Sequence, residues 1–508
     1  MLKFGILVIY ILSMGAFANA EVFTKQKNTE VFLIDNPSED EVVRLDILSR
    51  AKYSIQIVAH IQDASLFGSK ITEVIRGRMA EGVSLTYVYE KVASAIGGDM
   101  SDKSVNLLKD ASLYDGRKSR IYINRPLERL ETPFSIHDLF HEKIIIVDGG
   151  TPNETIMIGG RNHDMHGVEF SDLTFVLRPI EPGKAYLGDT LKEHYEKIIK
   201  ITDTYFSVES PRVVKPKELL AHAAILAKGQ YAPSTPKTMA IKKALNELPK
   251  RDEALLPYQF HPSWARLVTN DLFQTIIDKK LKKQLMVRQE LLSNDITTYV
   301  GGLMEGAKQV ISSTYVVAFP PDIANGYVNM LANGGQGLIY TNSPEAYAGK
   351  SPIKFFGTTY GALNYEALIK FQKVATAVHG AQTQYPEGVT SQDSKPQGKV
   401  DMMMLDPLKG HQAAGVVLNH KKAILVDYKD GRKIVITGSD NFNANSAAKN
   451  SELIVTFDDP RMHNYMADQL RTEGEAYYAK VDPNKAKEIL RKTKHSLNVC
   501  RGFFLSLF

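Results

Sequence analysis

The sequence contains a single cysteine, Cys500, among 508 residues. One thiol cannot form an internal disulfide, so the chain has to be stabilised by buried cores, for which its length is ample. A strong surplus of one charge is also missing, because 62 Lys and Arg face 57 Asp and Glu for a net charge of +5. A mildly basic protein suits an anionic partner but lacks the charge signature of a nucleic-acid-binding protein.

Apolar runs long enough to span a bilayer are missing from both ends of the chain. The start combines Lys3, an apolar run over residues 4–17 and the small residues Ala18-Asn19-Ala20. These features are typical of a secretory signal peptide. We therefore expect residues 1–20 to be a cleaved leader and the mature protein to be exported. It would be periplasmic or secreted, with a peripheral position on a membrane as a further expectation.

A block of polar residues occurs twice with the same internal spacing. Counted from a histidine, Lys, Asp, Gly and Asn lie at offsets 2, 7, 18 and 21 in both copies, and an acidic residue follows the Asn. The first copy is His141, Lys143, Asp148, Gly159, Asn162 and Asp172, and the second is His420, Lys422, Asp427, Gly438, Asn441 and Glu452. Several fixed positions that repeat together indicate a duplicated unit.

The local pattern explains why these residue types recur. The β-branched run 144–147 predicts a strand, glycines predict a turn, and residues 155–158 predict the returning strand. Side chains two apart on a strand share a face, so His141 and Lys143 point the same way. The hairpin returns Asn162 to the same patch. Two such patches facing each other would offer two imidazoles, two ammonium groups and two amides to one phosphodiester.

This duplicated His-x-Lys-x-x-x-x-Asp block, followed by Gly-Gly/Ser-x-Asn, resembles the phospholipase D superfamily. Residues 159–162 leading to 170–173, and Tyr340-Thr341-Asn342-Ser343, are similar to the bacterial cardiolipin synthases of that superfamily. The resemblance extends from about Asp35 to Ala479. It implies a phospholipase D-type phosphodiesterase or phosphatidyltransferase that acts through a phosphohistidine intermediate.

A β-α-β order precedes the block in each half, which predicts an α/β fold. We expect two similar α-β-α sandwich lobes related by pseudo-two-fold symmetry, with the active site in the cleft between them. The expected organisation is a signal peptide at 1–20, a first lobe at 21–206, an inter-lobe connector at 207–262, a second lobe at 263–482, and a basic and apolar tail at 483–508.

Catalysis is assigned to the two His-Lys pairs, because imidazole suits nucleophilic and acid-base work and ammonium groups neutralise phosphate charge. The catalytic residues are His141, Lys143, His420 and Lys422. Phosphate-binding residues are Asn162, Asn441 and Ser439. Orienting or supporting residues are Asp148, Asp427, Asp172 and Glu452. The residues alone do not tell which histidine attacks phosphorus, whereas the resemblance implies that His141 is the nucleophile.

A metal centre is the alternative that His137, His141, His163 and His166 raise. The lysine in each block would repel a divalent cation, so we expect no metal and no cofactor. The favoured substrate is an anionic phospholipid at a membrane surface, with transfer and hydrolysis both open. The less favoured substrate is nucleic acid, for which only the basic run 279–283 argues. A binding protein without catalysis is disfavoured because both blocks are intact, and no obligate protein partner is inferred.

Overall fold

The computed structural model describes residues 28–61, 66–90, 108, 119–124, 139–163, 170–205, 207–208, 239, 243, 259–260, 265–269, 294–348, 354–382, 398–443, 446–447 and 450–491. The expected signal peptide, the basic run 279–283 and the tail beyond 491 lie outside these residues. None of the described helices is both long and apolar enough to cross a membrane.

The first lobe contains a nine-stranded mixed sheet with the order β10-β4-β3-β2-β6-β7-β9-β1-β11. Its strands are β1 (Thr29–Ile34), β2 (Ser54–Ala59), β3 (Ser84–Glu90), β4 (Arg120–Asn124), β6 (Ile144–Val147), β7 (Thr155–Gly159), β9 (Thr174–Pro179), β10 (Ser207–Val208) and β11 (Gln259–Phe260). The hairpin expected from the motif is β6-β7, with Ile144 opposite Ile158.

The second lobe contains an eight-stranded sheet with the order β12-β20-β18-β17-β13-β14-β15-β21. Its strands are β12 (Ala265–Thr269), β13 (Ala307–Ser313), β14 (Gln336–Asn342), β15 (Lys399–Leu405), β17 (Ala423–Tyr428), β18 (Lys433–Gly438), β20 (Leu453–Phe457) and β21 (Tyr478–Lys480). The order β4-β3-β2-β6-β7-β9 of the first sheet matches β15-β14-β13-β17-β18-β20, including which neighbours are parallel. The duplication in sequence is therefore a duplication in fold.

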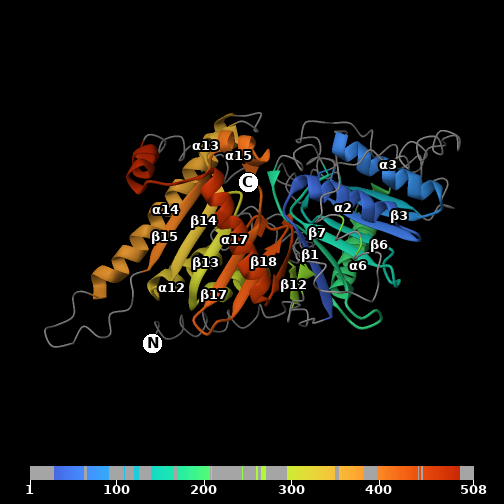
Figure 1. The fold of residues 1–508 in the computed structure, drawn as a ribbon, viewed down its shortest axis with the longest axis horizontal. Coiled ribbons are helices and arrows are strands. Elements are labelled where there is room, and N and C mark those ends of the chain that lie inside the picture. The colour runs from blue at the N-terminus through green and yellow to red at the C-terminus, as the bar shows by residue number, and fades with distance from the viewer. Residues whose placement is uncertain are drawn as a thin grey trace, which may run out of the picture.

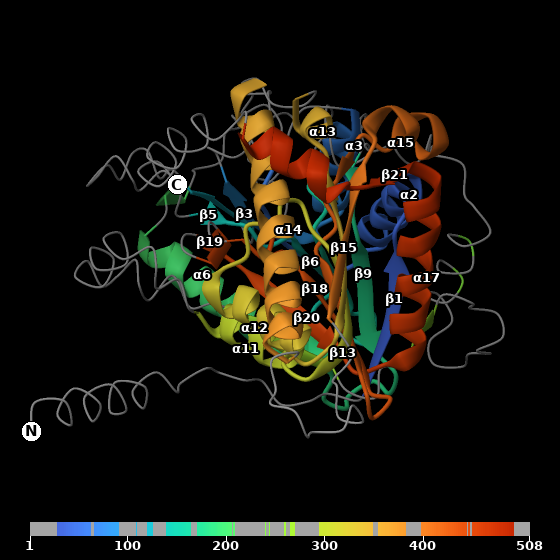
Figure 2. The same cartoon turned by 90° about the vertical axis from the view of Figure 1, so that its left-hand side faces the viewer.

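Helices complete the layers on both sides of each sheet (Figures 1 and 2). The first sheet packs against α2 (Pro37–Ser49) and α3 (Leu66–Ala80), and their buried side chains form one core with it. The second sheet packs in the same way against α11 (Asp295–Met304), α12 (Pro321–Ala332) and α14 (Lys354–Gln382). The short helices α13 (Pro344–Ala348) and α15 (Pro407–Ala414) complete the second lobe.

A third core joins the two lobes, which lie side by side in Figure 1. It includes residues from the closing helix of each lobe, α6 (Leu187–Tyr205) and α17 (Pro460–Tyr477), together with inner residues of both sheets. Phe175 of β9 and Phe457 of β20 meet across the contact with ring centroids 5.7 Å apart. The expected α/β fold with two similar lobes is confirmed.

Some elements differ from the sequence expectations. The strands β10 and β11 lie within the expected connector but pair with β4 and β1 of the first sheet. The helix α14 runs over 29 residues, Lys354–Gln382. The helix α15 was not expected, although Asp406 caps its N-terminus and Gly415 ends it in the left-handed conformation.

Candidate active site

Four short strands hold the motif histidines at the contact between the lobes. Strand β5 (Leu139–Phe140) of the first lobe pairs in parallel with β19 (Asn450–Ser451) of the second, and β16 (Leu418–Asn419) pairs with β8 (Phe170–Ser171). His141 follows β5, and its backbone N–H donates to the carbonyl of Ser451 at 3.0 Å. His420 follows β16 and donates in the same way to Ser171 at 2.8 Å. Each histidine is thus anchored to the opposite lobe.

Each imidazole also faces the acid of the opposite lobe. Nδ1 of His420 lies 2.5 Å from Oδ2 of Asp172, and Nδ1 of His141 lies 2.7 Å from Oε1 of Glu452. Both acids are buried, with relative exposures of 1% and 0%. Since an acid occupies the Nδ1 side of each ring, Nε2 is the nitrogen that each ring can present to a substrate.

The two lysines lie against the backbone of their own histidines. Nζ of Lys143 donates to the carbonyl of His141 at 2.5 Å, and Nζ of Lys422 donates to that of His420 at 2.6 Å. Both side chains are buried. Burial, together with the charge of the other lysine, lowers the pKa of Lys143 to about 7, and burial lowers the pKa of Lys422 to about 8. The site therefore concentrates cationic groups that an anion would stabilise.

The same charges act on the histidines and on Asp172. Burial and then Lys422 lower the pKa of His420 to about 4, and burial and then Lys143 hold the pKa of His141 well below its usual value. Burial alone would raise the pKa of Asp172, but Lys422 and His420 outweigh it, so that pKa lies below its usual value. Both imidazoles are thus neutral at neutral pH, and Asp172 is ionised.

The environment of Glu452 differs from that of Asp172. Burial raises the pKa of Glu452, and Lys143 only partly opposes this effect. Oγ of Ser439 donates to Oε2 of Glu452 at 2.5 Å and accepts from the backbone of Leu453 at 3.1 Å. The hydroxyl expected to contact phosphate is therefore engaged in holding the acid that faces His141.

The two asparagines expected to bind phosphate occupy matching places after β7 and β18. The Oδ1 atoms of Asn162 and Asn441 are buried, and neither has a hydrogen-bond partner among the described residues. The backbone of Asn441 is held by the side chain of Thr314, whose Oγ1 donates to the Asn441 carbonyl at 3.1 Å. Each amide oxygen is thus an acceptor available to an N–H or O–H group of a ligand.

The aspartates that end the motifs lie away from the histidines, at the far ends of β6 and β17. The carboxylate of Asp148 accepts from the backbone N–H groups of Lys52, Tyr53 and Ser54 at 2.7 to 3.1 Å. Its φ of 52° places it in the turn of the hairpin. Asp427 pairs across the hairpin with Lys433 and is half-exposed. The structure therefore places both outside the cluster formed by the His-Lys pairs.

Arg161, which follows the glycines of the first motif, and His60, which lies outside both motifs, also contact the cluster. The buried guanidinium of Arg161 donates to the carbonyls of Phe170 at 3.1 Å and Asp172 at 2.8 Å, which holds the strand that reaches His420. His60 packs edge-on against His141, with ring centroids 4.4 Å apart. An alignment of the two halves by strand order, rather than by the motif alone, would have drawn attention to His60.

Both motif glycines permit a close approach to the neighbouring strand. A Cβ on Gly159 would lie 2.3 Å from the carbonyl oxygen of Leu173, and one on Gly438 would lie 2.2 Å from that of Leu453. We expect Gly159→Ala to lower the free energy of unfolding by about 1–3 kcal/mol, because backbone atoms cannot move aside cheaply. Urea denaturation measures this change.

A matched control is Gly302→Ala in α11, where a Cβ meets nothing within 4 Å. This variant should be neutral or up to about 1 kcal/mol more stable, because alanine has the higher helix propensity. Equal stability of the two variants would contradict the close-packing argument at Gly159.

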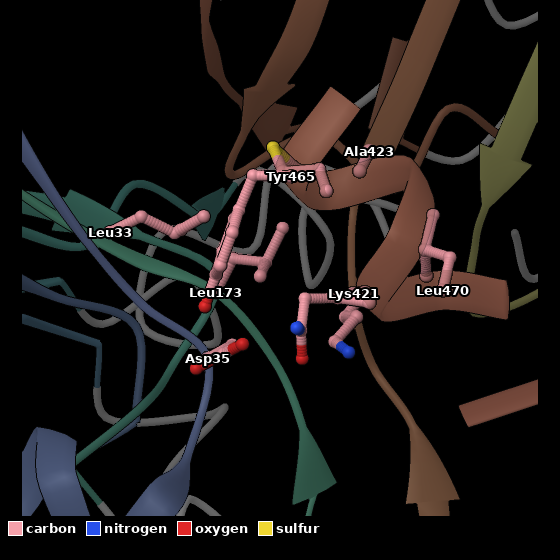
Figure 3. A pocket seen from close by; sticks show the side chains of 9 residues that line it. Leu33, Asp35, Leu173, Lys421, Ala423, Tyr465 and Leu470 are labelled. Atoms are coloured by element: carbon pink, nitrogen blue, oxygen red, sulfur yellow. The ribbon is translucent and has the colours of Figure 1, made fainter. Parts of the chain in front are cut away.

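A separate small pocket is lined by residues of both lobes (Figure 3). Lys421 alternates along the chain with His420 and Lys422 and therefore points away from them. The pocket is lined by Leu33, Asp35, Leu173, Lys421, Ala423, Tyr465, Met466, Gln469 and Leu470. None of the expected site residues lines it, and Lys421 forms an ion pair with Glu473 of α17.

Comparison with known proteins bears on the fold and on the second lobe. Residues 387–473, which include the second motif, match the family model described as cardiolipin synthase, PLD-like domain. No curated protein matches the sequence. The fold is similar to that of phosphatidylserine synthase from Haemophilus influenzae Rd KW20, with a TM-score of 0.55 and 11% identity over 98% of this chain and 99% of that chain.

Two further solved structures align more weakly. Polyphosphate kinase from Porphyromonas gingivalis aligns with a TM-score of 0.44 and 10% identity over 89% of this chain and 49% of that chain. Nuc, a phospholipase D family member from Salmonella typhimurium, aligns with a TM-score of 0.25 and 19% identity over 36% of this chain and 97% of that chain.

The family match covers the second motif, and the first lobe repeats both that motif and its strand order. Residues 387–473 thus resemble a cardiolipin synthase PLD-like domain in sequence, and the whole chain resembles phosphatidylserine synthase in fold.

Proposed function

We propose that this protein is an exported enzyme that cleaves or transfers a phosphatidyl group through a phosphohistidine intermediate. The observation that carries the proposal is that each motif histidine faces a carboxyl group of the opposite lobe. His141 faces Glu452 and His420 faces Asp172, with Lys143 and Lys422 buried beside them. Such a pair of neutral imidazoles among cations suits an anionic phosphodiester.

In the first step, Nε2 of His141 attacks phosphorus and forms a P–N bond while the bond from phosphorus to the leaving oxygen breaks. His420 gives its Nε2 proton to that oxygen. Before this step, the bound phosphate offsets the positive potential of the lysines, so the pKa of His420 rises from its low value and Nε2 takes up the proton from solvent. Asp172 stabilises the resulting imidazolium.

In the second step, His420 takes a proton from water or from an alcohol, whose oxygen attacks phosphorus and releases His141. Water completes hydrolysis, and an alcohol completes transfer. Lys143, Lys422 and the two asparagines bind the phosphoryl oxygens in both steps. An anionic phospholipid at a membrane surface is the proposed substrate, and removal of residues 1–20 during export is part of the proposal.

The test offers the mature protein, beginning at Glu21, three substrates in parallel. These are vesicles of phosphatidylglycerol, vesicles of phosphatidylcholine and single-stranded DNA, each also given to His141→Ala. Cardiolipin as product indicates transfer, and phosphatidic acid indicates hydrolysis. Cleavage of DNA with no reaction on either lipid would overturn the lipid proposal in favour of a nuclease.

The low pKa values of the lysines lead to a prediction for pH dependence. Both pKa values lie below the usual 10.5, at about 7 for Lys143 and about 8 for Lys422, so the free enzyme loses these charges as the pH rises through 7 to 8. We expect kcat/KM for the phosphodiester to fall about tenfold per pH unit for each lysine that deprotonates. A profile from pH 5.5 to 9.5 measures this, and a flat profile up to pH 9.5 would contradict it.

A further inference from the structure

The strand registers identify which residues of the two lobes are equivalent. Val58 of β2 and Ser313 of β13 each pair with the third residue after the motif histidine of their own lobe. Two residues beyond them stand His60 and Tyr315. These two side chains thus occupy corresponding positions, although one is an imidazole and the other a phenol.

Both of these rings pack edge-on against the motif histidine of their lobe. The ring centroids of His60 and His141 are 4.4 Å apart at an interplanar angle of 73°. Those of Tyr315 and His420 are 5.7 Å apart at 77°. An aromatic edge contact of this kind restricts the rotation of the ring that it touches.

The residue that precedes each motif histidine is held by hydrogen bonds that differ between the lobes. In the second lobe, Asn342 both accepts from the N–H of Asn419 at 2.7 Å and donates to its carbonyl at 2.8 Å. The same register places Glu90 at the position of Asn342. Glu90 accepts from the N–H of Phe140 at 2.7 Å, but a carboxylate has no N–H to donate to the Phe140 carbonyl. His60 fills this role, with Nδ1 at 3.2 Å from that oxygen.

We propose that His60 is the positioning residue for His141. It combines in one side chain the ring contact that Tyr315 supplies and the carbonyl contact that Asn342 supplies in the second lobe. It therefore holds both the backbone before His141 and the imidazole itself in the orientation that faces Glu452. The inference deepens the proposed function, on which it rests, because the orientation of His141 has a catalytic meaning only if this ring attacks phosphorus.

The tautomer of His60 follows from its hydrogen bond. A carbonyl oxygen only accepts, so Nδ1 of His60 carries a proton and donates it. Burial, followed by the charges of His141 and Lys143, holds the pKa of His60 well below its usual value. His60 is thus a neutral ring with a fixed donor, which lets it serve as a positioning group without adding charge beside the nucleophile.

The test converts the first lobe to the arrangement of the second. His60→Tyr keeps a ring but removes the donor to Phe140, and we expect kcat to fall about tenfold with KM within about twofold of wild type. Adding Glu90→Asn restores an amide donor, so the double variant His60→Tyr/Glu90→Asn should recover to within about threefold of the wild-type kcat. His60→Phe, which has no hydroxyl to accommodate, should match the loss seen in His60→Tyr.

Crystal structures give a second readout that does not depend on activity. The distance between Nδ1 of His141 and Oε1 of Glu452, 2.7 Å here, should lengthen in His60→Tyr and return in the double variant. Unchanged kcat and geometry in both single variants would overturn the role of His60, as would a loss that Glu90→Asn does not repair. A wild-type protein inactive on every phosphodiester would instead overturn the proposed function, while the crystallographic distances would still decide the positioning of His141.

Discussion

The variant His141→Ala should form no phosphoenzyme and should turn over at least about 10⁴-fold more slowly than the wild type, because the attacking nitrogen is gone. His420→Ala should behave differently. With a p-nitrophenyl phosphodiester, whose leaving group needs no proton, the intermediate should still form on His141 and then persist. Without His420, no base activates the water or alcohol that resolves it.

Rapid acid-free quenching of a reaction with ³²P-labelled substrate measures the protein-bound label. The expected result is no label on His141→Ala and a stable, near-stoichiometric label on His420→Ala. Label on His141→Ala and none on His420→Ala would reverse the two roles. Equal label on both variants would contradict the phosphohistidine mechanism at this pair.

The variant Asp172→Asn should lower kcat by about 10²- to 10⁴-fold, because its carboxylate orients His420 and stabilises the imidazolium that forms during the reaction. The carboxylate lies 2.5 Å from Nδ1 of His420 and 3.8 Å from Nζ of Lys422. Its pKa lies below the usual value, so the charge is present throughout the working range of pH. Loss of that charge also leaves the buried Lys422 without its nearest anion.

Glu452→Gln is the matched control for this prediction. Glu452 faces His141 in the same way, but burial raises its pKa, and hydrogen bonds from Ser439 and Asn450 would still hold a glutamine in place. We expect a smaller loss in kcat than for Asp172→Asn, with circular dichroism unchanged in both. A larger loss for Glu452→Gln would mean that the imidazolium stabilised in the transition state is His141, paired with Glu452, and not His420, paired with Asp172.

Local sequence patterns predict the hairpins of the site well. The β-branched run 144–147 forms β6, the glycines at 149–150 form the turn, and the strand alternation places Lys143 beside His141. The same reasoning holds for the second copy, so the sequence alone predicts both His-Lys pairs. These features depend on contacts between residues close in sequence, where period and turn chemistry are informative.

Positions outside the motif were harder to select. His60 directly follows an ordinary apolar strand, and nothing in the surrounding residues marks it as a neighbour of His141. Arg161 follows two glycines and could equally have contacted phosphate, whereas the fold buries it against the carbonyls of Phe170 and Asp172. Their roles arise from the packing of separate strands, which neither periodicity nor composition encodes.

By itself, the sequence determined that this protein has two copies of one α/β unit and that each copy presents an imidazole beside an ammonium group. Only the tertiary structure decided which acid serves which histidine, since His420 and Asp172 are 248 residues apart and meet because β8 and β16 pair across the lobes. The physical reason is that turn chemistry and apolar periodicity depend on residues close in sequence, whereas the shared core that brings Phe175 against Phe457 depends on the shape of both completed lobes.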